Sequence, residues 1–319
     1  MQRKSELLVH PEELSKKHID RMADAGIDIL GLHPVGGHFA DGSLRNLVER
    51  LKTQEMRELL DYAHERGLEI EYECHAASYL LPRALFESHP EYFRMDAEGE
   101  RTPQYNFCVS NEDALELYSD RAVELALSLY RSRPYFYFWM DDRRDAKCHC
   151  PACRPMSTSD QQLTVANRII RKLRRVIPDA HFAYLAYFES VVTPEHVKPE
   201  EGVFLEYAPF EKYVAKGENA QMLIQREQDM LRPTAEFFGK KDFKVLEYWY
   251  DNSMYSGWKK PPKLFTLNRE NMERDVRFYK EQGAASIASF ACYLGEDYEA
   301  LYGDESIDFA PFAKVMNEE

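Results

Sequence analysis

The chain alternates short apolar runs with longer segments in which apolar residues recur every three to four positions. Short runs of bulky apolar residues are typical of buried strands, whereas the longer spacing is typical of amphipathic helices. Glycines at 26, 67 and 283 each stand just before such a run, where helices commonly end. Eight strands are predicted, at residues 6–10, 27–33, 68–75, 135–142, 181–188, 203–207, 243–251 and 286–293. The segment 44–67 between two of them predicts one long helix.

Strands that alternate with helices predict a parallel sheet with helices on its faces. Closing eight such units gives a (β/α)8 TIM barrel of the α/β class, and the 319 residues suit one such domain over 1–319. The long connection after the third strand predicts an extended βα loop 3. A doubly wound open sheet is the alternative, but no Gly-rich phosphate loop follows the first strand.

The charge balance limits the classes of partner that the protein is expected to bind. The formal net charge is −14, with no basic stripe to offset it, which argues against nucleic acid or an anionic membrane surface. No apolar run is long enough to cross a membrane. The first residues lead into a charged pattern without a visible signal peptide, so a cytoplasmic location is expected. The oligomeric state stays open.

Acidic residues gather where the predicted strands end, which is where barrel enzymes place their chemistry. Two adjacent acids, Asp141 and Asp142, end the fourth strand. In the third strand the period of two directs Glu71, Glu73 and His75 into the barrel. For Glu69 and Glu71 we expect a salt-bridged layer in the barrel floor. For Glu73, Asp141, Asp142 and Glu247 we expect function, with Glu247 predicted to share an inward face with Val245, Trp249 and Asp251.

Aromatic residues and imidazoles at the same strand ends indicate a carbohydrate. Flat indole faces beside carboxylates hold sugar rings, and the three tryptophans all fall at or just after strand ends rather than in helical patterns. We therefore predict catalytic roles for Asp141, Asp142 and Glu247. The predicted substrate-binding residues are His33, Glu73, His75, Trp139, Tyr187, Glu206, Tyr207, Trp249, Tyr250, Trp258 and Tyr293.

Three cysteines lie close together just after the fourth strand, in the pattern Cys148-x-Cys150-x-x-Cys153. Tetrahedral zinc needs four ligands, and Cys108, His149 or a water can supply the last. A structural zinc held by Cys108 and these three is the preferred interpretation, because four thiolates saturate the metal. Free thiols, or two disulfides in an oxidising compartment, are the alternatives. No organic cofactor is expected.

Glycoside hydrolysis needs two acidic groups, of which one protonates the leaving oxygen and the other stabilises the developing positive charge. That second group can be a carboxylate, or the substrate's own 2-acetamido oxygen held by a neighbouring acid. Adjacent Asp141 and Asp142 suit the second arrangement. Their mutual repulsion would raise the pKa of one of them and keep it a proton donor.

Several motifs resemble a bacterial domain family of unknown function that is allied to glycoside hydrolases. They are Asn106-Phe-Cys-Val-Ser-Asn111, Asp141-Asp142, Cys148-x-Cys-Pro-x-Cys153 and Ala186-Tyr-Phe188, within a likeness from about Gly31 to Phe210. Some members are classed with endo-β-N-acetylglucosaminidases. The resemblance implies a (β/α)8 barrel acting on an oligosaccharide or other glycoside, with an N-acetylhexosamine as one expected substrate.

More distantly, Asp141-Asp142 is similar to the Asp-Glu pair of β-hexosaminidases that use substrate-assisted catalysis. By that likeness Asp141 would orient the acetamido group and Asp142 would be the general acid. Asp replaces Glu here, so Glu247 or Glu206 is an alternative donor.

Two other functions are kept beside the hydrolase. His10, His33, Glu73 and His75 on successive strands suit a metal-dependent sugar isomerase or epimerase. A non-catalytic carbohydrate-binding barrel would use the same rim residues.

Overall fold

Eight parallel strands form a closed barrel in sequence order in the computed structural model, which describes residues 3–129, 132–240, 242–303 and 305–318. The strands are β1 (Lys4–Val9), β2 (Ile29–Leu32), β3 (Glu69–His75), β4 (Tyr135–Trp139), β5 (His181–Ala186), β6 (Val203–Tyr207), β7 (Lys244–Glu247) and β8 (Ser286–Phe290). The predicted (β/α)8 barrel is therefore confirmed. Met1 and Gln2, on which the expected location partly rests, lie outside the described residues.

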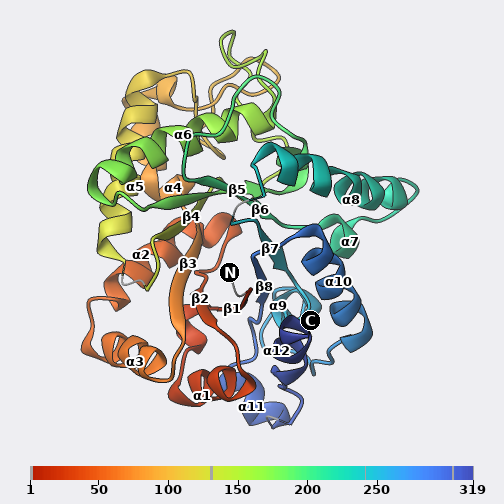
Figure 1. The fold of residues 1–319 in the computed structure, drawn as a ribbon. Coiled ribbons are helices and arrows are strands. Elements are labelled where there is room, and N and C mark those ends of the chain that lie inside the picture. Colours follow the sequence, from red (N-terminus) through yellow and green to blue (C-terminus); the bar gives the residue numbers. More distant parts are fainter. Residues whose placement is uncertain (1–2, 130–131, 241, 304, 319) are drawn as a thin grey trace.

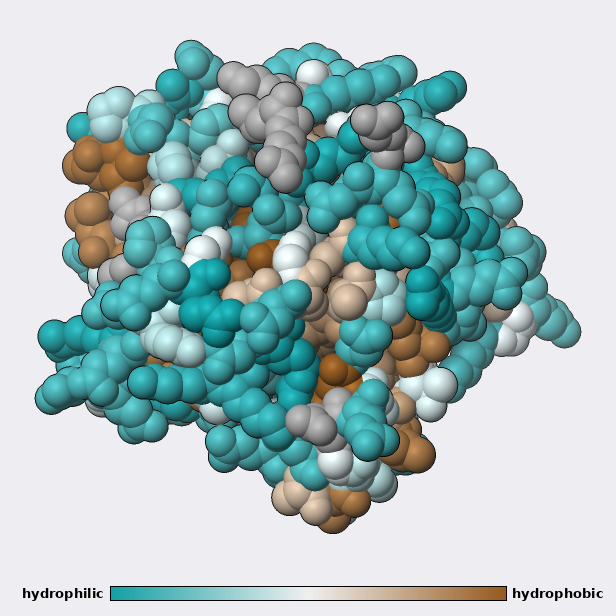
Figure 2. Space-filling view, turned by 60° about the horizontal axis from the view of Figure 1, so that its bottom comes forward, coloured by the Kyte–Doolittle hydropathy of each residue, from teal (hydrophilic) through white to brown (hydrophobic). Residues whose placement is uncertain are grey.

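Helices form a ring around the barrel (Figure 1). The longer ones are α1 (Lys16–Ala25), α2 (Ala40–Arg50), α3 (Gln54–Glu65), α5 (Glu112–Ser128), α6 (Thr158–Val176), α8 (Ala220–Phe237), α10 (Arg269–Gln282) and α12 (Ala310–Asn317). The shorter ones are α4 (Ala77–Leu80), α7 (Glu211–Val214), α9 (Asn252–Tyr255) and α11 (Glu296–Tyr302). Across the described residues, no helix has the length and apolar character needed to span a membrane. The face seen in Figure 2 is mostly hydrophilic, with small apolar patches.

The single helix predicted over 44–67 is wrong, because the chain forms α2 and α3 instead. Thr53 begins the second helix, and its side chain accepts a hydrogen bond from the backbone N–H of Met56. This cap satisfies a backbone donor that a continuous helix would satisfy internally. The apolar spacing continues across the break, so periodicity alone did not reveal it.

The predicted orientation of the side chains is confirmed in β3 and β4 but wrong in β7. Tyr137 and Trp139 belong to the cluster inside the barrel, as expected. In β7, however, Leu246 lies inside the barrel and Val245 in the layer under the helices. Glu247 therefore faces outward, because strand neighbours alternate between faces. Apolar residues stand at both phases of this strand, so its hydrophobic pattern did not distinguish them.

The barrel floor is an ionic layer beneath the active end. Lys244 is buried inside the barrel, and its ammonium contacts Glu6, Glu71 and Glu73. Arg133 pairs with the other oxygen of Glu71 at 2.9 Å. The predicted salt-bridged layer thus exists, and it includes Glu73, for which we had expected a functional position.

The connection between β3 and α5 contains α4 and further short turns, as expected for an extended βα loop 3. Hereafter we call residues 76–111 loop 3, and we call residues 140–157, between β4 and α6, loop 4. These two loops carry most of the chemistry described below.

Candidate active site

A cavity of about 840 Å³ opens at the carboxyl ends of the strands, the usual place for a barrel enzyme's active site. We call it the mouth cavity. Aromatic and aliphatic side chains line its base, among them Trp139, Leu246 and Phe290. The predicted site residues that line it are His33, His75, Trp139, Asp142, Tyr187, Trp258 and Tyr293. A cavity of this size and apolar character suits a small ligand with a few polar contacts.

Asp142 presents a carboxylate to the mouth cavity. It follows β4 and is exposed, and its Oδ1 accepts a hydrogen bond of 3.0 Å from the Tyr187 hydroxyl. Burial raises the pKa of Tyr187, and the negative charge of Asp142 adds to that shift, so the phenol stays protonated and continues to donate. The tyrosine therefore fixes one oxygen of Asp142 and leaves the other for a ligand.

A second carboxylate reaches the cavity from the other side of the barrel. Asp251 follows β7 and caps α9, where its Oδ1 accepts hydrogen bonds from the backbone N–H groups of Ser253 and Met254. Burial raises its pKa, which favours the protonated form. The two acids follow β4 and β7, three strands apart in the barrel order, and both line the mouth cavity.

Asp141 does not line the mouth cavity, although the sequence predicted it as a catalytic partner of Asp142. Its carboxylate instead binds the Arg83 guanidinium and the backbone N–H of Asn106, both in loop 3. In return, Asn106 Oδ1 accepts from the backbone N–H of Asp141 at 2.8 Å. Asp141 thus ties loop 3 to the end of β4 and holds the backbone from which Asp142 projects.

Three histidines on consecutive strands form a ladder at the cavity wall. His10 Nδ1 donates to the His33 carbonyl, and His33 Nδ1 donates to the Glu73 carbonyl, both at 2.8 Å. His75 Nδ1 donates to the Met140 carbonyl at 2.7 Å. A carbonyl can only accept, so each Nδ1 carries the proton. Burial, with repulsion from the other two imidazoles, lowers the pKa of His33, whose neutral ring leaves Nε2 as an acceptor for a ligand hydroxyl.

The ladder does not form the metal site that the isomerase alternative needs. Among the described residues, ligand atoms of three or more acidic, cysteine or histidine side chains gather within 4.8 Å in only two places. One is the cysteine cluster, and the other is Glu6, Glu71 and Glu73 around Lys244. The Glu73 carboxylate lies in the ionic floor rather than beside the imidazoles.

Glu206 supports the aromatic base from below. It is buried, and its Oε2 accepts a hydrogen bond of 2.7 Å from the Trp139 indole N–H. The buried carboxyls of Glu206 and Glu73 also interact with each other. Burial raises the pKa of Glu206 to about 7. Its position below the cavity suits the orientation of Trp139 rather than contact with a ligand.

This raised pKa predicts a pH-dependent stability. Because the folded pKa of Glu206 lies above its unfolded value, its contribution is complete below about pH 4.5 and is lost as the pH rises through about 7. We expect Glu206→Gln, which keeps the acceptor for Trp139, to be more stable than the natural protein by about 3 kcal/mol at pH 8. Near pH 4.5 the two proteins should be equal. Urea denaturation at both pH values, with the exposed Glu195→Gln as control, measures this, and an equal difference at both would contradict it.

Four predicted site residues lie outside the barrel. Glu247 accepts hydrogen bonds from Tyr213 and Tyr279, each on a neighbouring helix, and Trp249 donates to Asp275. The hydroxyls of Tyr207 and Tyr250 donate to the backbone carbonyls of Glu227 and Asp308. These residues stabilise the contact between the barrel and its helices, so we propose no catalytic or sugar-binding role for them.

The four cysteines predicted as metal ligands are brought together. Cys108 in loop 3 lies 3.6 Å from Cys150 and 3.9 Å from Cys153 of loop 4, sulfur to sulfur, and Cys148 completes the group. These separations exceed the bond length of about 2.05 Å in a disulfide. They match the roughly 3.8 Å expected between sulfurs in a tetrahedral zinc site with bonds of about 2.3 Å. The cluster therefore has the donor set and spacing that zinc requires.

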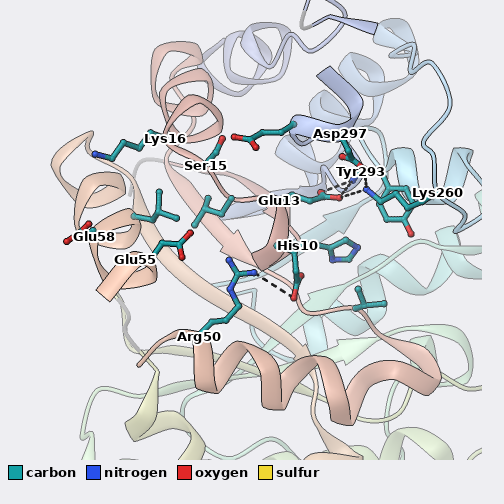
Figure 3. A pocket seen from close by; sticks show the side chains of 15 residues that line it. His10, Glu13, Ser15, Lys16, Arg50, Glu55, Glu58, Lys260, Tyr293 and Asp297 are labelled. Carbon is teal, nitrogen blue, oxygen red and sulfur yellow. Dashed lines mark hydrogen bonds and ion pairs between the residues drawn. The ribbon is translucent and has the colours of Figure 1, made fainter. Parts of the chain in front are cut away.

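A second cavity of about 790 Å³ adjoins the first and shares His10, Val35 and Tyr293 with it (Figure 3). Glu13 lines this second cavity (Figure 3). Both oxygens of its carboxylate accept hydrogen bonds from the backbone N–H of Tyr293, and one of them pairs with Lys260. The two cavities together offer more room than one sugar ring needs.

Sequence reasoning missed several residues of the mouth cavity. Tyr248 directly follows β7, the strand whose orientation was predicted wrongly, and Asp251 was predicted to face inward but was assigned no role. Arg94, Arg143 and Arg144 also line the cavity. They follow strand ends in long loops, and that position was the one sequence signal available for them.

A family model described as "Domain of unknown function (DUF4838)" matches residues 45–293. No curated protein matches the chain in sequence. Among solved structures, PbGH5A, a glycoside hydrolase family 5 enzyme from Prevotella bryantii B14 in complex with a xyloglucan tetradecasaccharide, gives a TM-score of 0.55 at 10% identity, over 96% of this chain and 87% of that one.

Two further structures are similar. Endo-glycoceramidase II from Rhodococcus sp., as a lactosyl-enzyme intermediate, gives a TM-score of 0.56 at 11% identity over 91% and 73% of the two chains. ZgEngAGH5_4 in complex with a cellotriose gives 0.51 at 12% identity over 96% and 88%. At such low identity these similarities establish a shared barrel fold.

Proposed function

The chain belongs to the family described as "Domain of unknown function (DUF4838)", and from this premise we propose that it is a glycoside hydrolase acting on an oligosaccharide. One observation carries the proposal. Asp142 and Asp251 present carboxylates to a single aromatic-lined cavity at the carboxyl ends of the strands. Glycosidic hydrolysis requires two acids flanking one bond, and aromatic faces bind sugar rings by stacking.

The surroundings of the two acids suggest different roles. Burial raises the pKa of Asp251, so this carboxyl is suited to donate a proton to the leaving oxygen. Asp142 accepts from Tyr187, an arrangement suited to an ionised carboxylate that stabilises positive charge at the sugar carbon. His33 and His75 would accept hydrogen bonds from sugar hydroxyls while the ring stacks on Trp139.

The sequence resemblance supports an N-acetylhexosamine as one substrate. The resemblance also implies that Asp141 orients the acetamido group. We do not propose this role, because Asp141 binds Arg83 and Asn106. The similar structures support carbohydrate as the ligand class, since their proteins are described with xyloglucan, lactosyl and cellotriose groups.

A panel of defined oligosaccharides tests the proposal. It should include N-acetylhexosamine, glucan and uronate-bearing members, with release of shorter products followed by mass spectrometry. We expect cleavage of at least one member, lost in Asp142→Asn. Binding without cleavage across the panel would favour a carbohydrate-binding barrel instead.

We also propose that the four-cysteine cluster holds a structural zinc that clamps loop 3 to loop 4. Three of the four cysteines lie in loop 4, which also carries Asp142, and Arg101 interacts with Cys108, which offsets part of the negative charge of the thiolates. Gln161 further fixes loop 4 by hydrogen bonds to the backbone N–H and carbonyl of Cys148. A thiolate-saturated zinc would hold structure rather than activate water.

The zinc proposal predicts one zinc per chain in the purified protein, measured by elemental mass spectrometry. Cys150→Ser should lose the metal and about 4 kcal/mol of stability, the effect of losing a ligand present at a thousandfold above its Kd. Cys74→Ser, a buried cysteine outside the cluster, should keep the zinc. Zinc-free protein of unchanged stability would contradict the proposal.

A further inference from the structure

Arginines gather on one side of the mouth cavity. Arg94 comes from loop 3, and Arg143 and Arg144 come from loop 4. Arg144 has an acidic partner, because it pairs with Glu211 at 2.7 Å. Arg94 and Arg143 have no carboxylate within 4.0 Å among the residues that the structure describes. Two guanidinium groups therefore line the cavity without an ion pair to the described residues, although the charge of Asp96 acts on Arg94 and Asp142 and Asp145 line the same cavity.

The surroundings of Arg94 and Arg143 hold them in place. The Arg94 Nε donates to the Gln104 carbonyl at 2.9 Å, which leaves its two Nη groups without a partner from the described chain. Burial lowers the pKa of Arg94, against the opposing charges of Asp96 and Cys148 and with a smaller contribution from repulsion by Arg143 and Arg83. Arg143 lies over the ring of Tyr105, with its guanidinium carbon 5.2 Å from the ring centre. Ordered donors in a cavity lose less entropy when they bind a ligand.

This local charge contrasts with the rest of the chain. Of the other cavity groups that could be positive, His33 is held neutral by burial and by repulsion from its neighbouring imidazoles. Arg144, the third arginine of the lining, pairs with Glu211. In a protein of net charge −14, the unpaired donors therefore mark one side of the cavity as suited to an anion.

We propose that Arg94 and Arg143 form a subsite for an acidic group of the substrate, so that this protein acts on an oligosaccharide carrying a carboxylate or a sulfate. The inference rests on the proposed function and deepens it. A guanidinium binds a carboxylate or sulfate through two parallel hydrogen bonds, and such charge-assisted bonds are strong and directional. The neutral part of the sugar ring would lie over the aromatic base, with Asp142 beside the arginines in loop 4 and Asp251 on the other side of the barrel.

The test compares uronate-bearing oligosaccharides, such as hyaluronan, oligogalacturonide and glucuronoxylan fragments, with their carboxyl-reduced forms. Isothermal titration calorimetry of the natural protein and of Asp142→Asn gives affinities with and without turnover. We expect at least one acidic fragment to bind about tenfold more tightly than its reduced form. A sulfated derivative of the reduced form distinguishes sulfate from carboxylate as the preferred anion.

Substitution of each arginine is the second part of the test. Arg143→Gln and Arg94→Gln should each weaken binding of the acidic fragment by about tenfold and leave the reduced fragment within about twofold. Arg143→Lys should retain part of the preference, because it keeps the charge without the two-pronged geometry. Arg175→Gln is the matched control, since Arg175 is exposed on α6 and does not line the cavity.

The outcomes separate this inference from the proposed hydrolase activity. Arginine-dependent binding of acidic fragments without any cleavage would support the subsite and contradict the hydrolase. Cleavage of acidic and reduced fragments with equal kcat/KM would support the hydrolase and overturn the subsite. Loss of preference in Arg175→Gln as large as in Arg143→Gln, or no binding of any acidic fragment, would also overturn it.

Discussion

Asp142→Asn is expected to lower kcat/KM by about a thousandfold on any glycoside that the protein cleaves, without a change in Tm. The loss is large because a carboxylate that stabilises charge or transfers a proton acts only in the transition state, where such groups contribute roughly 10²–10⁴-fold. Stability should be unchanged because Asp142 is exposed and makes one side-chain hydrogen bond, to Tyr187. Steady-state kinetics and thermal unfolding of the same preparation measure both quantities.

Two further variants decide whether the effect belongs to Asp142 itself. Asp145→Asn removes an exposed acid that also lines the mouth cavity, and it should keep nearly full activity. Asp251→Asn should lose activity while the protein stays folded, because asparagine caps a helix as well as aspartate does. Retention of more than about a tenth of the activity in Asp142→Asn would remove it from the mechanism.

Asp141→Asn should behave differently from Asp142→Asn. Its carboxylate accepts from Arg83 and from the backbone of Asn106, so its loss loosens loop 3 before it affects chemistry. The sequence placed both acids at the end of β4 correctly. Which of two consecutive side chains enters the cavity depends on loop 3, whose contacts join residues 35 positions apart and leave no periodic signal.

The sequence predicted the structure well where polar or metal-binding residues recur at a fixed local spacing. The alternation of acids with apolar residues in β3 gave the correct inward face, and the spacing of Cys148, Cys150 and Cys153 identified a cluster that Cys108 completes. Prediction failed in β7, where each face carries one apolar and one charged residue, Leu246 with Lys244 inward and Val245 with Glu247 outward. A buried lysine is costly without partners, so its inward position is understandable only once the acids of β1 and β3 are seen around it.

Lys244 provides the second large prediction. Lys244→Met should lower the free energy of unfolding by about 3–5 kcal/mol at pH 8, because it leaves Glu6, Glu71 and Glu73 buried around an uncharged side chain. The loss should be smaller at pH 5. Burial raises the pKa of Glu6 and of Glu73, and neighbouring carboxyls add to both shifts while the Lys244 ammonium opposes them. Both carboxyls can therefore take up protons in the folded protein as the pH falls, which stabilises it relative to the unfolded chain.

The exposed pair Lys52–Glu49 supplies the control, since Lys52→Met breaks a contact of similar length, 2.7 Å, at the surface and should cost less than about 1 kcal/mol. Adding Glu73→Gln to Lys244→Met should recover part of the lost stability, because one buried charge is removed with its partner. Urea denaturation of these proteins and of Glu73→Gln alone, at pH 5 and pH 8, completes the double-mutant cycle and gives the coupling between Lys244 and Glu73. An equal loss at both pH values would mean that Lys244 acts by filling space, and the ionic floor would then have no electrostatic role in holding β1, β3 and β7 together.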